Sequence, residues 1–133
     1  MKNNKKVLVD MTCSILHFGH IRLLKKASKL GKVIVALAKD KDIKKYKKFT
    51  TPFNFKQRKE ILSSVKYVSN VIKADYFITE KFLKKNNIDY LVHGSDNKNK
   101  VPRKYLKLFK RTKNISSSKL RKKIKKNINL IFN

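Results

Sequence analysis

The chain has 133 residues, of which 41% are hydrophobic, and 36 lysines and arginines against eight acidic residues give a formal net charge of +28. This length and apolar content fit one domain with a single modest core and exclude a disordered chain. Because no apolar run is long enough to span a bilayer, the first six residues do not resemble a signal peptide, and the lone Cys13 has no disulfide partner, we expect a cytoplasmic protein without membrane insertion.

Strands and helices are predicted to alternate from the start of the chain. Residues 7–11, apolar apart from Asp10, and the continuous apolar run at residues 33–38 are typical of buried strands in a parallel sheet. Between them, residues 19–30 carry apolar side chains at helical spacing, and Gly31 is expected to end that helix. Residues 44–53 are basic and aromatic and are predicted to form a loop.

The same alternation continues in the second half. Residues 54–57 resemble a capping box and predict the start of a helix that contains Arg58. Strands are predicted at residues 67–72 and 89–93, with a short helix around Phe82 between them.

A weaker fifth strand is predicted at residues 106–110, and a final basic helix is capped by residues 116–118. We expect a single domain over residues 1–126 and a C-terminal tail over residues 127–133. Alternating strands and helices predict an α/β fold, a Rossmann-like doubly wound parallel sheet of five strands.

The tetrad His17-Phe18-Gly19-His20 lies where the first strand passes into the first helix. A helix N-terminus offers unpaired N–H groups and a partial positive charge, and Gly19 lets a polyphosphate approach the backbone. The two imidazoles can donate hydrogen bonds to oxygens that gain charge in a transition state. The tetrad therefore predicts a site that holds a reacting phosphate.

Other polar residues also follow predicted strands. Asp40 follows the second strand, residues 94–96 the fourth, and Arg111 and Thr112 the fifth. In doubly wound sheets ligands bind beyond the carboxyl ends of the strands, so these residues are expected to meet His17 in one site.

Three motifs occur in order, at residues 17–20, 92–96, and 111–112 with 115–118. With these motifs the chain resembles the cytidylyltransferases of the HxGH nucleotidyltransferase superfamily over residues 7–124. The segment at residues 92–96 is most similar to the phosphoethanolamine branch, whereas the short length is more similar to the glycerol-3-phosphate enzymes.

The resemblance implies that CTP and a small phosphorylated alcohol give a CDP-alcohol and pyrophosphate, with Mg²⁺ accompanying the triphosphate and a homodimer as the assembly. The scarcity of acids favours glycerol 3-phosphate, an uncharged head group, as the acceptor. Phosphoethanolamine, phosphocholine and a phosphonate are the open alternatives.

The resemblance also assigns roles to single residues. The expected catalytic residues are His17, His20, Lys47 and Arg111. The expected nucleotide-binding residues are Thr12, Gly19, Asp96, Arg111, Thr112, Ile115, Ser116 and Ser117. The acceptor is expected to contact Arg58, Lys45 and Asp40.

Two residues before the tetrad depart from the family pattern. Met11 and Ser14 stand where the family commonly has glycine and aspartate before the tetrad. Because a carboxylate that could orient a metal is missing there, no metal ligand is assigned.

Two other functions are also considered. Residues 115–118 followed by Arg121 resemble the last motif of the adenylyltransferases, although Asp96 and Arg111 favour cytidine. The charge alone fits a basic nucleic-acid-binding module. However, the lysines are spread along a chain that is also rich in asparagine and isoleucine, which favours a compositional bias with only non-specific attraction to polyanions.

Overall fold

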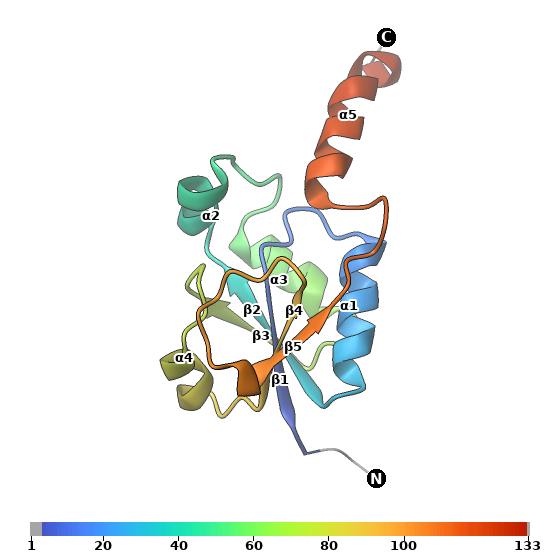
Figure 1. Ribbon diagram of the computed structural model, residues 1–133. Helices are drawn as coiled ribbons and strands as arrows, with labels where there is room; N and C mark the ends of the chain where they lie inside the picture. The colour runs from blue at the N-terminus through green and yellow to red at the C-terminus, as the bar shows by residue number, and fades with distance from the viewer. Residues whose placement is uncertain (1–3, 133) are drawn as a thin grey trace.

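The computed structural model describes residues 4–132, with side chains through Ile128. Five parallel strands form one sheet in the order β3-β2-β1-β4-β5 (Figure 1). The strands are β1 (Lys6–Met11), β2 (Lys32–Ala38), β3 (Asn70–Ala74), β4 (Tyr90–Gly94) and β5 (Leu106–Phe109). The helices are α1 (Phe18–Ser28), α2 (Asp40–Lys47), α3 (Phe55–Ser63), α4 (Glu80–Lys85) and α5 (Ser117–Phe132), with a 3₁₀ turn η1 (Arg103–Tyr105).

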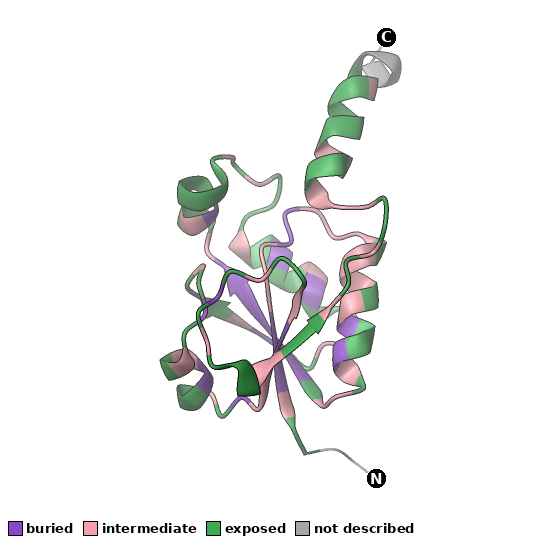
Figure 2. Ribbon diagram, viewed as in Figure 1, coloured by how far each residue is buried: buried purple, intermediate pink, exposed green. Residues whose placement is uncertain are grey.

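Helices cover both faces of the sheet because successive strand residues point to opposite sides. Val9 of β1 lies in one core with Leu24 of α1 and Leu62 of α3. Leu8, its neighbour in the chain, lies in the second core with Leu83 of α4. The buried strands between exposed helix surfaces are visible in Figure 2. The predicted doubly wound parallel sheet of five strands is therefore confirmed.

The centre of the sheet is a topological switch point. β1 pairs with β2 on one side, and after β3 the chain returns so that β4 pairs with β1 on the other side. Met11 and Gly94 end these two central strands. The loops that follow them diverge, which leaves room for a ligand beyond the carboxyl ends.

The third strand lies further along the chain than predicted. The apolar run at residues 67–72 was predicted to be the strand, but β3 begins at Asn70. Tyr67 and Val68 pack against the core from the turn before it. Because β3 is an edge strand, it can carry exposed polar side chains such as Lys73, so the apolar run did not mark its bounds.

Helix α2 was not predicted, and four of the ten residues of the predicted loop at residues 44–53 belong to it. Ile43 is its only buried residue, so no apolar period marks the helix. Asp40 and Asp42 lie in its first turn, where carboxylates interact favourably with the helix dipole. Lys48 follows the helix in a left-handed conformation, with φ of 60°.

Helix α5 extends away from the rest of the molecule in Figure 1. The helix passes through Asn127, where the C-terminal tail was predicted to begin, so that division lies within a helix. At its other end α5 begins at Ser117, inside the predicted capping segment. Among the described residues, no helix combines the length and the apolar character needed to cross a bilayer.

Candidate active site

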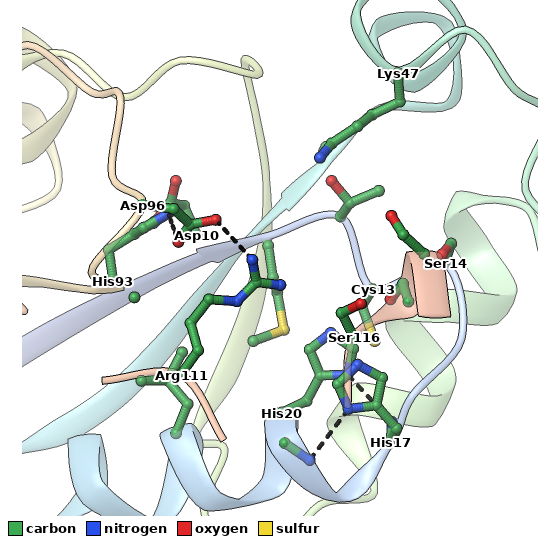
Figure 3. A pocket seen from close by; sticks show the side chains of 18 of the residues that line it. Asp10, Cys13, Ser14, His17, His20, Lys47, His93, Asp96, Arg111 and Ser116 are labelled. Atoms are coloured by element: carbon green, nitrogen blue, oxygen red, sulfur yellow. Dashed lines mark hydrogen bonds and ion pairs between the residues drawn. The ribbon is translucent and has the colours of Figure 1, made fainter. Parts of the chain in front are cut away.

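A cleft of about 440 Å³ opens beyond the carboxyl ends of the strands (Figure 3). Its walls come from the loops after β1 and β4, the start of α1, the end of α2 and the segment before α5. The predicted residues that line it are Thr12, His17, Gly19, His20, Lys47, Asp96, Arg111, Thr112, Ile115, Ser116 and Ser117.

The two histidines of the tetrad cap helix α1 and stack on each other. His17 is the N-cap, and its Nδ1 accepts from the backbone N–H of Gly19 at 3.1 Å. His20 Nδ1 accepts from the backbone N–H of His17, also at 3.1 Å. The two ring centroids are 3.9 Å apart. The capping box therefore fixes both imidazoles relative to each other at the helix N-terminus.

These hydrogen bonds also decide which nitrogen carries the proton. Since both Nδ1 atoms accept from backbone N–H groups, each neutral ring must carry its proton on Nε2. Burial lowers the pKa of His17, and Arg111 lowers it further. Burial, His17 and Arg111 together lower the pKa of His20 to about 3. At neutral pH both rings are uncharged and each offers an Nε2–H donor.

We expect the imidazole of His20 to remain neutral in the folded protein well below pH 6.5. The unfolded chain binds this proton near pH 6.5, whereas the native state binds it only near pH 3. As the pH falls between these values, the free energy of unfolding therefore decreases by up to about 1.4 kcal/mol per pH unit. Imidazole ¹⁵N shifts across a pH titration measure the proton directly. Protonation of His20 near pH 6.5 would contradict the buried environment.

Gly19 is required by the His17 ring. A Cβ at Gly19 would lie 2.9 Å from Cε1 of His17 and 3.2 Å from Cγ2 of Ile115. The missing side chain therefore lets the imidazole and the segment before α5 approach the helix N-terminus together.

The start of α5 meets the loop after β1. Ser116 Oγ accepts from the backbone N–H of Lys119 at 3.1 Å, as a helix cap does. Arg121 donates to Ser14 Oγ at 3.3 Å, and its guanidinium lies 4.0 Å from the ring centroid of Phe49. At Ser14, where the family pattern has a carboxylate, the cleft therefore has a hydroxyl and a neighbouring cation.

Asp96 and Arg111 lie opposite the histidines. Arg111 Nη1 donates to Asp96 Oδ2 at 3.3 Å, and both side chains are about half exposed. A Cβ at Gly94 would lie 2.9 Å from Asp96 Oδ1, so this glycine makes room for the carboxylate. An exposed carboxylate and guanidinium side by side can hydrogen-bond a planar base.

The structure does not bring Arg58 and Asp40 into the cleft. Arg58 is 1% exposed and donates to the backbone carbonyls of Thr12 and Phe53, at 2.8 and 3.2 Å. Its third contact is Asp40 Oδ1 at 2.6 Å. Because Arg58 is buried and its Nε, Nη1 and Nη2 each have a partner in the protein, the guanidinium positions the backbone at Thr12 instead of meeting an acceptor directly.

The two predicted lysines differ in position. Lys47, the last residue of α2, extends towards the cleft in Figure 3. Lys45 does not line the cleft, and its ammonium lies 5.1 Å from the ring of its neighbour Tyr46. Because both belong to a helix, they point in different directions.

Two groups in the cleft were not among the predicted site residues. Tyr46 and Tyr76 stack at 4.7 Å, and Phe77 contacts both rings edge-on. Asp10, at the end of β1, receives a 2.6 Å hydrogen bond from His93. The rule that ligands collect at strand ends could have identified Asp10.

Comparisons with known proteins show which proteins the chain is similar to. Glycerol-3-phosphate cytidylyltransferase of Staphylococcus aureus (strain NCTC 8325 / PS 47) is 33% identical over 129 residues, covering 90% of this chain and 95% of the relative. The protein of the same name from Bacillus subtilis (strain 168) is 34% identical, covering 90% and 97%. Ethanolamine-phosphate cytidylyltransferase of Arabidopsis thaliana is 36% identical over 98 residues, covering 68% of this chain and 23% of the relative.

The fold has a counterpart among solved structures. A lipopolysaccharide core biosynthesis protein from Thermoplasma volcanium GSS1 superposes with a TM-score of 0.63 at 24% identity, covering 92% of this chain and 87% of that one. The family described as cytidylyltransferase-like matches residues 12–123, which include the histidine pair, Asp96, Arg111 and the start of α5. The chain therefore belongs to the cytidylyltransferase-like family, whose members are nucleotidyltransferases.

Proposed function

We propose that the protein transfers CMP from CTP to glycerol 3-phosphate and releases CDP-glycerol and pyrophosphate. The observation that carries the proposal is the capped, stacked pair His17 and His20, which places two neutral Nε2–H donors at a helix N-terminus inside the cleft. The acceptor is chosen because two relatives that align with nine-tenths of this chain are named for that reaction.

The reaction needs no covalent enzyme intermediate. An oxygen of the acceptor's phosphate forms a bond to the α-phosphorus of CTP, and the bond from that phosphorus to the bridging oxygen breaks as pyrophosphate leaves. Because a phosphate is already a nucleophile, the protein's task is to position the two substrates and stabilise the charge that develops on the phosphoryl oxygens.

The chain divides this task between neutral donors and cations. His17 and His20 donate from Nε2 to phosphate oxygens, without the cost of burying two positive charges next to each other. Lys47, at the end of α2, and Arg111, in the segment after β5, both line the cleft and supply positive charge. Lys47 ends a helix, so its long side chain can follow the triphosphate as it binds.

We include Mg²⁺ in the proposal only as the partner of the triphosphate. Among the described residues no three histidine, cysteine or acidic side chains are grouped to hold a metal ion. Of the carboxylates that line the cleft, Asp10 is held by His93 and Asn99, Asp75 by Lys39, and Asp96 by Arg111, so they do not form a dedicated magnesium site. Magnesium usually binds phosphates and water with few protein ligands, and it would neutralise part of the triphosphate charge.

A second acceptor class is favoured by one observation. The rings of Tyr46, Tyr76 and Phe77 line the cleft, whereas Asp75, which also lines it, is ion-paired with Lys39 at 2.7 Å. Aromatic faces bind an ammonium through cation–π contacts. An aminated acceptor such as phosphoethanolamine is therefore the alternative to glycerol 3-phosphate.

The test is a matrix of nucleotides and acceptors. The purified protein with Mg²⁺ should release pyrophosphate fastest from CTP with glycerol 3-phosphate, and mass spectrometry should detect CDP-glycerol. Faster release with phosphoethanolamine would move the assignment to the second acceptor class. Preference for ATP over CTP would instead favour an adenylyltransferase.

A homodimer and a cytoplasmic location are part of the same proposal. The dimer is carried over from the family resemblance, and sedimentation equilibrium of the protein tests it directly. The location is supported by Cys13, a buried cysteine without a disulfide, since such a thiol suits a reducing compartment.

A further inference from the structure

Two carboxylates, an imidazole and a guanidinium form a row in the cleft that runs from Asp10 on the central strand to Arg111 (Figure 3). Asp10 Oδ1 lies 2.6 Å from His93 Nδ1, and His93 Nε2 lies 3.8 Å from Asp96 Oδ1. The other oxygen of Asp96 accepts from Arg111 at 3.3 Å. The row therefore joins β1, β4 and the segment after β5, which are far apart in the sequence.

The Asp10 end of this row is rigid. Asp10 is 11% exposed, and its second oxygen accepts from Asn99 Nδ2 at 2.9 Å. Asn99 is itself buried and accepts from the backbone N–H of Ile78 at 2.7 Å. Since both oxygens of Asp10 have partners in the protein, this carboxylate fixes the orientation of the His93 ring and is not free for a substrate.

At the other end of the row, the Asp96 side chain is 54% exposed, so its carboxylate can move when the charge of the His93 ring changes. With His93 protonated, a positive ring faces the Asp96 carboxylate. In the neutral ring the remaining proton stays on Nδ1, next to Asp10, and Nε2 presents a lone pair to Asp96. The interaction at 3.8 Å then changes from attraction to repulsion.

We propose that His93 is a positioning residue that, anchored by Asp10, holds the Asp96 carboxylate for the cytosine and links CTP binding to the uptake of one proton. The inference depends on the proposed function, since it takes CTP as the ligand. Asp96 accepts from the cytosine amino group, which uracil lacks, so the same link governs the preference for CTP over UTP.

Three charged groups act on the His93 ring: Asp10 from β1, Asp96 from the loop after β4, and Arg111 from the segment after β5. Burial and Arg111 lower its pKa, but the hydrogen bond and charge of Asp10, with the charge of Asp96, raise it overall above 6.5. CTP that binds the protonated form more tightly must raise this pKa by the same factor, because linkage is reciprocal.

The test measures the dissociation constant of CTP by calorimetry, without acceptor, from pH 5.5 to 9. For the unmodified protein we expect affinity to fall about tenfold as His93 loses its proton, with a smaller fall for UTP. His93→Gln should bind CTP weakly, and its affinity should not show this fall with pH. Any pH dependence that remains in His93→Gln reports the titration of CTP itself and is subtracted. Asp10→Asn should move the step to lower pH, because the ring loses its carboxylate partner.

Glu60→Gln is the matched control, since it removes one negative charge from an exposed site on α3 and should leave the step in place. A His93→Gln profile identical to that of the unmodified protein would overturn the inference, whereas absence of CTP binding at every pH would overturn the proposed function as well. If Asp10→Asn does not fold, the ¹⁵N titration of His93 in the unmodified protein decides. CTP should raise its pKa by about 1, and an unchanged pKa would overturn the inference.

Discussion

Replacing His20 by glutamine is expected to lower kcat by about 10²–10³ while changing the free energy of unfolding by no more than about 0.5 kcal/mol. Glutamine at this third position of the helix keeps the capping box, since its amide oxygen can accept from the backbone N–H of His17 as Nδ1 of His20 does. The imidazole Nε2–H donor in the cleft is lost. The change therefore separates the chemical role of the ring from its role as a cap.

Two further variants complete this comparison. His17→Asn keeps an N-cap side chain that can accept from Gly19 and should reduce kcat to a similar extent. His20→Ala removes the donor and the cap together, so it should also lose about 1 kcal/mol of stability. Steady-state kinetics and urea unfolding measure the two effects. A kcat for His20→Gln within tenfold of the unmodified protein would refute the role of this imidazole in the transition state.

Replacing Arg58 by methionine is expected to destabilise the fold by roughly 2–4 kcal/mol. The guanidinium is 1% exposed and satisfies the carbonyls of Thr12 and Phe53, which would be left without their donors. Asp40 contributes less, because its side chain is about half exposed and solvent screens its charge.

The family resemblance assigned Arg58 to the acceptor, and the same variant tests that role. If Arg58 only supports the backbone at Thr12, Arg58→Met should lower the free energy of unfolding without raising the KM for the acceptor. Asp40→Asn should then lower the free energy of unfolding by under about 1 kcal/mol. Chemical denaturation and the KM for glycerol 3-phosphate distinguish the roles. If Arg58→Met is as stable as the unmodified protein but has a raised KM for the acceptor, the prediction of a direct contact between Arg58 and the acceptor would be right.

Local patterns predicted the parts of the fold that depend on neighbouring residues. Residues 7–9 of β1 and 33–38 of β2 are buried on both faces and therefore appear as continuous apolar runs. Asn54 and Gln57, three residues apart, form the predicted capping box of α3. Helix α2 and the bounds of β3 were missed, because α2 buries only Ile43 and β3 lies at the edge of the sheet, where polar side chains can face water.

The candidate site divides in the same way. His17 caps α1 and His20 lies three residues later in its first turn. The sequence by itself therefore determined that their rings would meet at the helix N-terminus. Asp10 and His93 are 83 residues apart, and only the pairing of β1 with β4 brings them within 2.6 Å. Likewise, whether Arg58 faces a substrate or the interior depends on what packs over α3. Contacts within one turn follow from chain geometry, whereas contacts between elements depend on how the sheet is ordered and covered, which no single segment encodes.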